Sequence, residues 1–115
     1  MLNPQQNVTA MPQFDAPGFI EPAIDENEPI KIRRKRLKFR SWHRGIKEAD
    51  ILLGHFADGH LDGLDDGQLD RYENLLREPD IRIVAWITKD TPVPEYLQND
   101  VMDMLQALDY LKIIK

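Results

Sequence analysis

The side chains best suited to chemistry in this sequence are three histidines and an acidic, glycine-containing stretch. His55 and His60 are five residues apart, so they share no helical face, and neither they nor His43 have a carboxylate at a zinc-binding spacing. Residues 58–66 supply several aspartates. No register there places oxygen ligands at the first, third and fifth positions of a calcium loop with glycine at the sixth. We therefore expect surface histidines, a solvated turn and no metal site.

Nucleophilic and phosphate-binding chemistry has little support either. The chain has no cysteine, which excludes disulfides, thiol catalysis and cysteine-based zinc sites. No two glycines are separated by a single residue, as a glycine-rich phosphate loop requires. Ser41 is the one serine of residues 31–115, and nothing around it resembles a strained nucleophile elbow. We predict no catalytic residue and expect that the protein is not an enzyme.

The most informative segment runs from Ser41 to Asp50. Arg44 and Glu48 lie four residues apart around the start of an expected helix. An ion pair in this order would stabilise a helix by only about 0.2–0.5 kcal/mol, and a cation at a helix N-terminus opposes the helix dipole. A guanidinium, a bare backbone at Gly45 that another surface can approach, and a carboxylate one turn along would suit a recognition site. The alternative is a simple intrahelical ion pair.

A strongly basic run surrounds the start of this segment. Residues 31–48 carry nine basic side chains and one acid, although the whole chain has a net charge of −5. Such a run can contact nucleic-acid phosphates, form a solvated cationic helix face, or dock an acidic protein partner. Residues 31–115 balance 15 basic against 15 acidic residues, and no second element is available to read base edges. We therefore favour the acidic partner over nucleic acid.

The elements that must position these residues are helical. Apolar residues recur at spacings of three and four throughout, which predicts helices over about 28–43 and 46–57, then from Asp65, from Pro79, and along a seam ending at Leu111. Asp65 and Gln68 have the spacing of a capping box, and Pro79 suits a first helical turn. Residues 58–64 are expected to form a loop. The predicted fold is all-α, a compact five-helix bundle.

The first 30 residues differ in composition from the rest. They hold five of the eight prolines and five acids but no lysine or arginine, so we expect a disordered tail over 1–30 and a folded domain over 31–115. No apolar run approaches the roughly 20 residues needed to cross a bilayer, and no targeting pattern is evident. We accordingly expect a monomer without membrane insertion, in a bacterial cytoplasm.

The residues around Arg44 resemble a known family. Arg44-Gly45-Ile46-Lys47-Glu48 is similar to the Arg-Gly-x-x-Glu motif of the succinate dehydrogenase assembly factor 2 family, called SdhE in bacteria. The similarity continues through the apolar run after Glu48, through Tyr72-Glu-Asn-Leu-Leu, and through Pro79-Asp80 with the later Trp86. Order and spacing agree over roughly residues 36–112, and the first 30 residues lie outside the resemblance.

The resemblance implies a five-helix bundle and a chaperone-like assembly factor. Such a factor promotes covalent attachment of FAD to the flavoprotein subunit of succinate dehydrogenase and, in some bacteria, of fumarate reductase. FAD would then be the partner's cofactor, and this chain would hold none stably. Carried over, Arg44, Gly45 and Glu48 would meet the flavoprotein near its flavin. The residues bordering that surface would be Arg40, Trp42 and His43. A nucleic-acid binder and a generic helical adaptor are the alternatives that the residues leave open.

Overall fold

The computed structural model describes residues 23–109, and these residues contain five α-helices and no strand. The helices are α1 (Ile30–Trp42), α2 (Lys47–His60), α3 (Asp66–Leu75), α4 (Asp80–Ile87) and α5 (Asp100–Gln106). Two short 3-10 turns, η2 (Leu61–Gly63) and η3 (Glu95–Leu97), lie between them. The prediction of an all-α, five-helix bundle is therefore confirmed.

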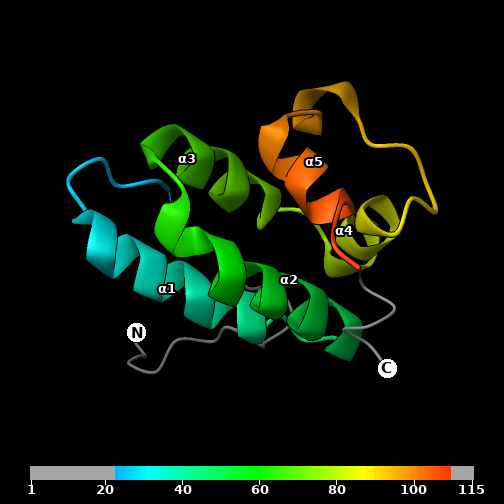
Figure 1. Ribbon diagram of the computed structural model, residues 1–115, viewed down its shortest axis with the longest axis horizontal. Helices are drawn as coiled ribbons and strands as arrows, with labels where there is room; N and C mark the ends of the chain where they lie inside the picture. The colour runs from blue at the N-terminus through cyan, green and yellow to red at the C-terminus, as the bar shows by residue number, and fades with distance from the viewer. Residues whose placement is uncertain (1–22, 110–115) are drawn as a thin grey trace, which may run out of the picture.

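The helices surround one apolar core. α1 and α2 lie side by side as an antiparallel pair (Figure 1). α3 contacts α1, α4 contacts α2, and α5 contacts both α3 and α4. Helices α2, α3, α4 and α5 bury mainly apolar side chains, as expected for elements that must bury one face. The buried face of α1 is different, because it combines Leu37 with the polar side chains of Arg33, Arg40 and Ser41. Fully buried side chains come from α1, α2, α3, α4 and α5; among them are Leu37, Phe56, Tyr72, Ile83 and Leu105.

One polar contact is built into this core. Ser41 is fully buried, its hydroxyl donates to the Leu37 carbonyl at 2.7 Å, and its oxygen lies 2.5 Å from the Tyr72 hydroxyl. Burial raises the pKa of the Tyr72 phenol above its ordinary value. The Tyr72 hydroxyl also donates to the Leu53 carbonyl at 3.4 Å, so neither of these buried hydroxyls lacks a hydrogen-bond partner.

Residues close in sequence determine several of the helix ends. Asp65 caps α3, because its carboxylate accepts from the Gln68 N–H at 2.8 Å and the Gln68 side chain accepts from the Asp65 N–H at 3.1 Å. This is the predicted capping box, and Pro79 stands at the N-cap of α4. α2 extends to His60, three residues beyond the expected end, because an isolated glycine costs a helix only about 1 kcal/mol.

The last helix differs more from its predicted form. We expected a single helix from about Leu97 along a seam to Leu111, whereas α5 begins at Asp100. The cause is Asn99, whose side chain accepts from the Met102 N–H at 3.0 Å and so starts the helix there. Leu97 remains buried, but within the separate turn η3. Leu111 lies outside the described residues.

Part of the expected N-terminal tail has described structure. Residues 1–22 lie outside the described range, whereas 23–29 form an irregular stretch and turn that lead into α1. The Glu28 carboxylate accepts two hydrogen bonds from Arg36, at 2.9 and 2.8 Å. These bonds hold the pKa of the Glu28 carboxyl below its ordinary value. The intramolecular contacts thus begin before residue 30.

The α1–α2 pair depends on a close contact at Gly54. A Cβ atom placed there would lie 2.2 Å from an indole carbon of Trp42, which no real contact permits. Gly59, on the same helix, would have nothing within 4 Å of such an atom. Gly54 is therefore required by the approach of α1, whereas Gly59 is not.

We predict that Gly54→Ala lowers the free energy of unfolding by roughly 1–3 kcal/mol, because the added methyl group overpacks the helix interface. Gly59→Ala is the matched control, and it should be neutral or stabilising by up to about 1 kcal/mol because alanine favours the helix. Urea unfolding followed by circular dichroism measures both. Equal stability of the two variants would show that Trp42 does not pack on Gly54 as described.

Candidate functional site

The predicted site residues lie at the junction between α1 and α2. α1 ends at Trp42, and four residues, 43–46, carry the chain to the start of α2. Gly45 has a φ of +121°, a backbone conformation that L side chains rarely adopt. Ile46 is extended and precedes the first turn of α2. A glycine in this link therefore lets the chain reverse direction within a few residues.

Arg44 of this junction is buried rather than presented to solvent. Its side chain is 4% exposed; the Nε atom donates to the Asp80 carboxylate at 2.8 Å, and Nη2 donates to the Leu76 carbonyl at 2.7 Å. Its backbone N–H donates to the Asp50 carboxylate. Arg44 thus joins the junction to the end of α3 and to the first residue of α4. We refer to this set of contacts as the Arg44 clamp.

Arg44 and Glu48 do not form the intrahelical ion pair that the sequence left open as an alternative. Arg44 precedes α2, which begins at Lys47, so the two residues do not share a helix. Glu48 is exposed in the first turn of α2, where a carboxylate interacts favourably with the helix dipole. The motif therefore combines a buried guanidinium with an exposed acid.

Gly45 is exposed between them. The nearest atom to a Cβ placed on it is an Asp80 carboxylate oxygen at 3.9 Å, an ordinary contact distance. Space within the chain therefore permits a side chain, and the positive φ is what demands glycine. The bare backbone of Gly45 faces solvent directly beside the start of α4.

The residues expected to border the site, Arg40, Trp42 and His43, also differ in how far they are buried. Arg40 is 4% exposed, and its Nη1 donates to the His43 carbonyl at 2.5 Å. His43 is exposed and its ring stacks on Phe39 with centroids 4.0 Å apart. Trp42 is half-buried, and its Nε1 donates to the Asp58 carboxylate at 3.2 Å. The part of the predicted site that a partner can reach is thus His43, Gly45, Glu48 and one side of Trp42.

The arginines of the basic run are largely used within the molecule. Arg33, 5% exposed, pairs with Asp70 at 2.6 Å and with the fully buried Glu73 at 3.1 Å. Arg36 pairs with Glu73 at 3.0 Å as well as with Glu28. Buried charges require such partners, because an unpaired charge in the interior is strongly destabilising.

The other basic side chains of this run are either bonded within the fold or exposed to solvent. Arg34 donates to the carbonyls of Leu61 and Leu64, at 2.9 and 2.7 Å, and so holds η2 against α1. Lys38 pairs with the Asp62 carboxylate at 3.0 Å, whereas the exposed lysines are Lys31, Lys35 and Lys47. The expected cationic docking face is therefore far smaller than the sequence suggested, since most of its arginines stabilise the fold.

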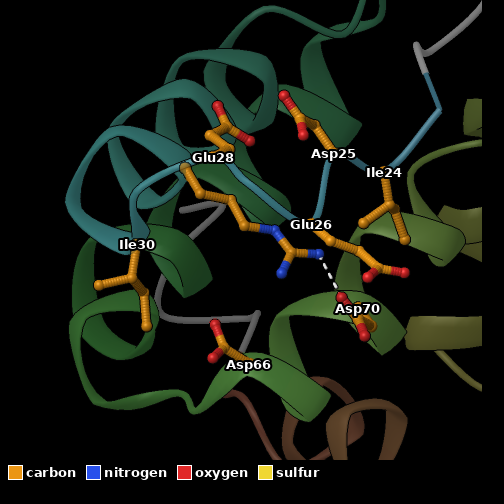
Figure 2. A pocket seen from close by; sticks show the side chains of 8 residues that line it. Ile24, Asp25, Glu26, Glu28, Ile30, Asp66 and Asp70 are labelled. Carbon is orange, nitrogen blue, oxygen red and sulfur yellow. Dashed lines mark hydrogen bonds and ion pairs between the residues drawn. The ribbon is translucent and has the colours of Figure 1, made fainter.

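A hollow of about 500 Å³ lies beside Arg33, between the start of α1 and α3. The acidic residues that line it are Asp25, Glu26, Glu28, Asp66 and Asp70. The dashed line in Figure 2 marks the ion pair that Arg33 makes with Asp70. The arginine balances part of this acidic charge. The hollow thus belongs to the ion-pair network that anchors α1 to α3.

Metal and membrane chemistry find no support within residues 23–109. That stretch contains no group of three or more histidine, aspartate and glutamate side chains placed to hold a metal ion. The histidines contact separate aromatic rings: His43 stacks on Phe39, His55 meets Trp42, and His60 stacks on Phe56. In the same residue range, no helix has the length and apolar character to cross a membrane.

Asp80 and Glu73 are the important residues that sequence reasoning missed. The sequence marks Asp80 only as part of the Pro79-Asp80 pair. An acid at the first position of a helix is nevertheless a sign of an electrostatic role, because it interacts favourably with the helix dipole. Glu73 stands between the inward-facing Tyr72 and Leu75, a position where an acid must find an internal partner. Neither feature could identify the partner, because the arginines lie 36 to 40 residues away in sequence.

The chain is similar to known proteins over most of these residues. Residues 35–109 match the model of a family described as flavinator of succinate dehydrogenase. Three relatives carry the name succinate dehydrogenase assembly factor 2, mitochondrial. The protein from Meyerozyma guilliermondii is 44% identical over 91 residues, 76% of this chain and 67% of that protein. The one from Debaryomyces hansenii is 42% identical over 76% of this chain and 64% of that protein.

The third relative comes from Danio rerio and is 43% identical over 69% of this chain and 51% of that protein. The chain thus spans about half to two thirds of the length of these relatives. All three are named mitochondrial, and they come from two yeasts and an animal. This finding contradicts the bacterial cytoplasmic location that we expected, so that prediction was wrong.

We predict that the Arg44 clamp contributes to stability. Arg44→Ala should lower the free energy of unfolding by roughly 2–4 kcal/mol, because it leaves the Leu76 carbonyl and the Asp80 carboxylate without their donor. Asp80→Ala should also destabilise, and the double variant should cost clearly less than the sum of the single changes. Urea unfolding of the four proteins gives this coupling energy.

Glu48→Ala is the control for this cycle, and it should change stability by about 0.5 kcal/mol or less because Glu48 is exposed. Strictly additive effects of Arg44→Ala and Asp80→Ala would contradict the clamp.

Proposed function

The chain belongs to the family of succinate dehydrogenase flavinators, and from this membership we propose that it promotes covalent attachment of FAD to the flavoprotein subunit of succinate dehydrogenase. The match over residues 35–109 carries the proposal. It covers all of α2, α3, α4 and α5 and the C-terminal part of α1, and so includes the junction with the Arg-Gly-x-x-Glu motif.

In this proposal the chain acts as an assembly factor and not as an enzyme. When bound in the flavoprotein, the flavin supplies the reactive carbon and accepts the electrons of the attachment reaction, and the partner supplies the histidine that becomes bonded. FAD is therefore the partner's cofactor and is not held stably by this chain. Flavinylation is then a reaction of the flavoprotein on itself, which the factor assists, and fumarate reductase would be a second client.

The residues of this chain would act by docking. His43, Gly45 and Glu48 are the exposed members of the predicted site, and the Arg44 clamp holds the junction against α4. A monomer docked through this surface could hold the flavoprotein in the arrangement that favours attachment, a gain of orientation rather than of new chemistry. The absence of a side chain at Gly45 would let the partner's surface approach the backbone closely.

The alternatives differ in ways that an experiment can measure. A nucleic-acid binder would bind duplex or single-stranded nucleic acid with an affinity that falls steeply with salt. The internal ion pairs of Arg33 and Arg36 leave few arginines for that purpose. A generic helical adaptor would bind partners without changing their content of bonded flavin.

The flavoprotein subunit should acquire covalent flavin faster when it is produced together with this chain. Both preparations are denatured, separated on a gel and compared by flavin fluorescence, which detects only flavin that survives as a covalent adduct. We expect a several-fold stronger signal with the chain present. Equal signals, with and without the chain, at early and late times would contradict the proposed function.

Glu48→Lys should reduce this signal several-fold while leaving the fold intact, because the exposed carboxylate lies on the docking surface. Asp66→Lys is the matched control. Asp66 is also an exposed acid in the first turn of a helix, but it lies at the start of α3, beyond the far end of α2 (Figure 1). Both changes should cost about 0.3–1 kcal/mol of helix-dipole stabilisation. If both variants flavinylate alike, Glu48 is not a contact residue.

A further inference from the structure

Ile81 is the most exposed of the large apolar side chains in the described part of the chain. Its relative exposure is 74%, whereas Ile83 and Ile87 of the same helix are fully buried. Isolated apolar residues are common on protein surfaces and need no explanation by themselves. The informative feature of Ile81 is its place in the fold, because it follows Asp80, the acid of the Arg44 clamp.

The clamp brings Ile81 to the predicted site. Asp80 accepts from Arg44 at 2.8 Å, and its other carboxylate oxygen lies 3.9 Å from the Cβ position of Gly45. The first turn of α4 and the α1–α2 junction therefore form one continuous surface, although 35 residues separate them in sequence. Ile81, the residue after Asp80, exposes its apolar side chain in this first turn of α4.

Folding gives no reason for isoleucine at this position. A side chain that is 74% exposed contributes little burial, and isoleucine favours a helix less than alanine, leucine or lysine does. In a binding interface, by contrast, a central apolar side chain within a polar rim provides much of the affinity. Exposed Arg82 and Glu48 would supply such a rim.

We propose that Ile81 is an apolar anchor of the surface that docks the flavoprotein subunit, where it enters an apolar depression of that partner next to the Gly45 contact. This inference rests on the proposed function, because it takes the flavoprotein as the occupant. Its basis in the structure is the continuity between α4 and the junction. The partner must then cover two segments of this chain at once, the junction and the first turn of α4.

The test compares Ile81→Asp with Ile32→Asp. Ile32 is also exposed, at 57%, and it also lies in the first turn of a helix, at the start of α1 and away from the junction. An aspartate in a first turn suits the helix dipole, so both variants should melt close to the unchanged protein. Ile81→Ala, which adds no charge, is a second variant at the site.

The affinity of each full-length protein for the purified flavoprotein subunit is measured by calorimetry. We expect Ile81→Asp to bind at least about tenfold more weakly and Ile81→Ala to be weakened in the same direction, while Ile32→Asp binds normally. Flavinylation of the flavoprotein subunit should be slow when the Ile81→Asp protein is present at a limiting concentration. The rate should recover when this variant is in large excess. A merely structural role would not give this recovery.

Each outcome has a distinct meaning. Unchanged affinity of both Ile81 variants overturns the inference even if the unchanged chain promotes flavinylation. An equal loss for Ile32→Asp also overturns it, because the effect would then not depend on the junction. If the unchanged chain binds the flavoprotein but does not raise its covalent flavin, the proposed function fails, whereas the affinities still decide the role of Ile81.

Discussion

The guanidinium of Arg44 fixes the geometry on which the candidate site depends. It lies in a four-residue link and donates to Asp80 and to the Leu76 carbonyl, so one side chain connects four of the five helices. A buried cation is tolerated only where its donors meet acceptors, and these partners exist only when α3 and α4 are packed in place. The exposed surface at Gly45 is consequently a product of the whole bundle rather than of a local turn.

The same principle explains why the charge pattern of the sequence was misleading. Arginine offers five donors in a planar arrangement that can bridge carboxylates and carbonyls from different elements. Arg33, Arg34 and Arg36 do this, joining α1 to α3 and to the turn after α2. Lys31, Lys35 and Lys47 remain exposed. A cluster of basic residues in a sequence is therefore not yet a cationic surface, because acids far away in the chain can neutralise it inside the fold.

The sequence allowed accurate prediction of many features whose determining contacts are local, although the Asn99 cap that starts α5 was missed. The capping box of Asp65 depends on residues three apart and was found as expected. The apolar spacings predicted the five helices of the described residues but not every buried face, because Ile32 and Ile81 are exposed. The sequence could propose a candidate site but could not describe its contacts, because Arg44 bonds to partners 32 and 36 residues away. Nor could the sequence show that Gly54 rather than Gly59 contacts Trp42. The predicted bacterial cytoplasmic location was wrong because it rested only on the lack of a recognisable targeting pattern. Such a lack does not specify any one cellular compartment.

The division of the motif into buried and exposed parts has a consequence for binding. If a docking surface becomes ordered only on association, the loss of conformational entropy in its loops and side chains weakens binding. Here the link between α1 and α2 is held by the Arg44 clamp and by the Asp50 carboxylate, so the backbone at Gly45 is ordered before any partner arrives. In the proposed docking surface, arginine, glycine and glutamate would therefore have different roles. Arg44 holds the link in place and Gly45 permits its backbone conformation, while the exposed Glu48 would offer a charge to a partner.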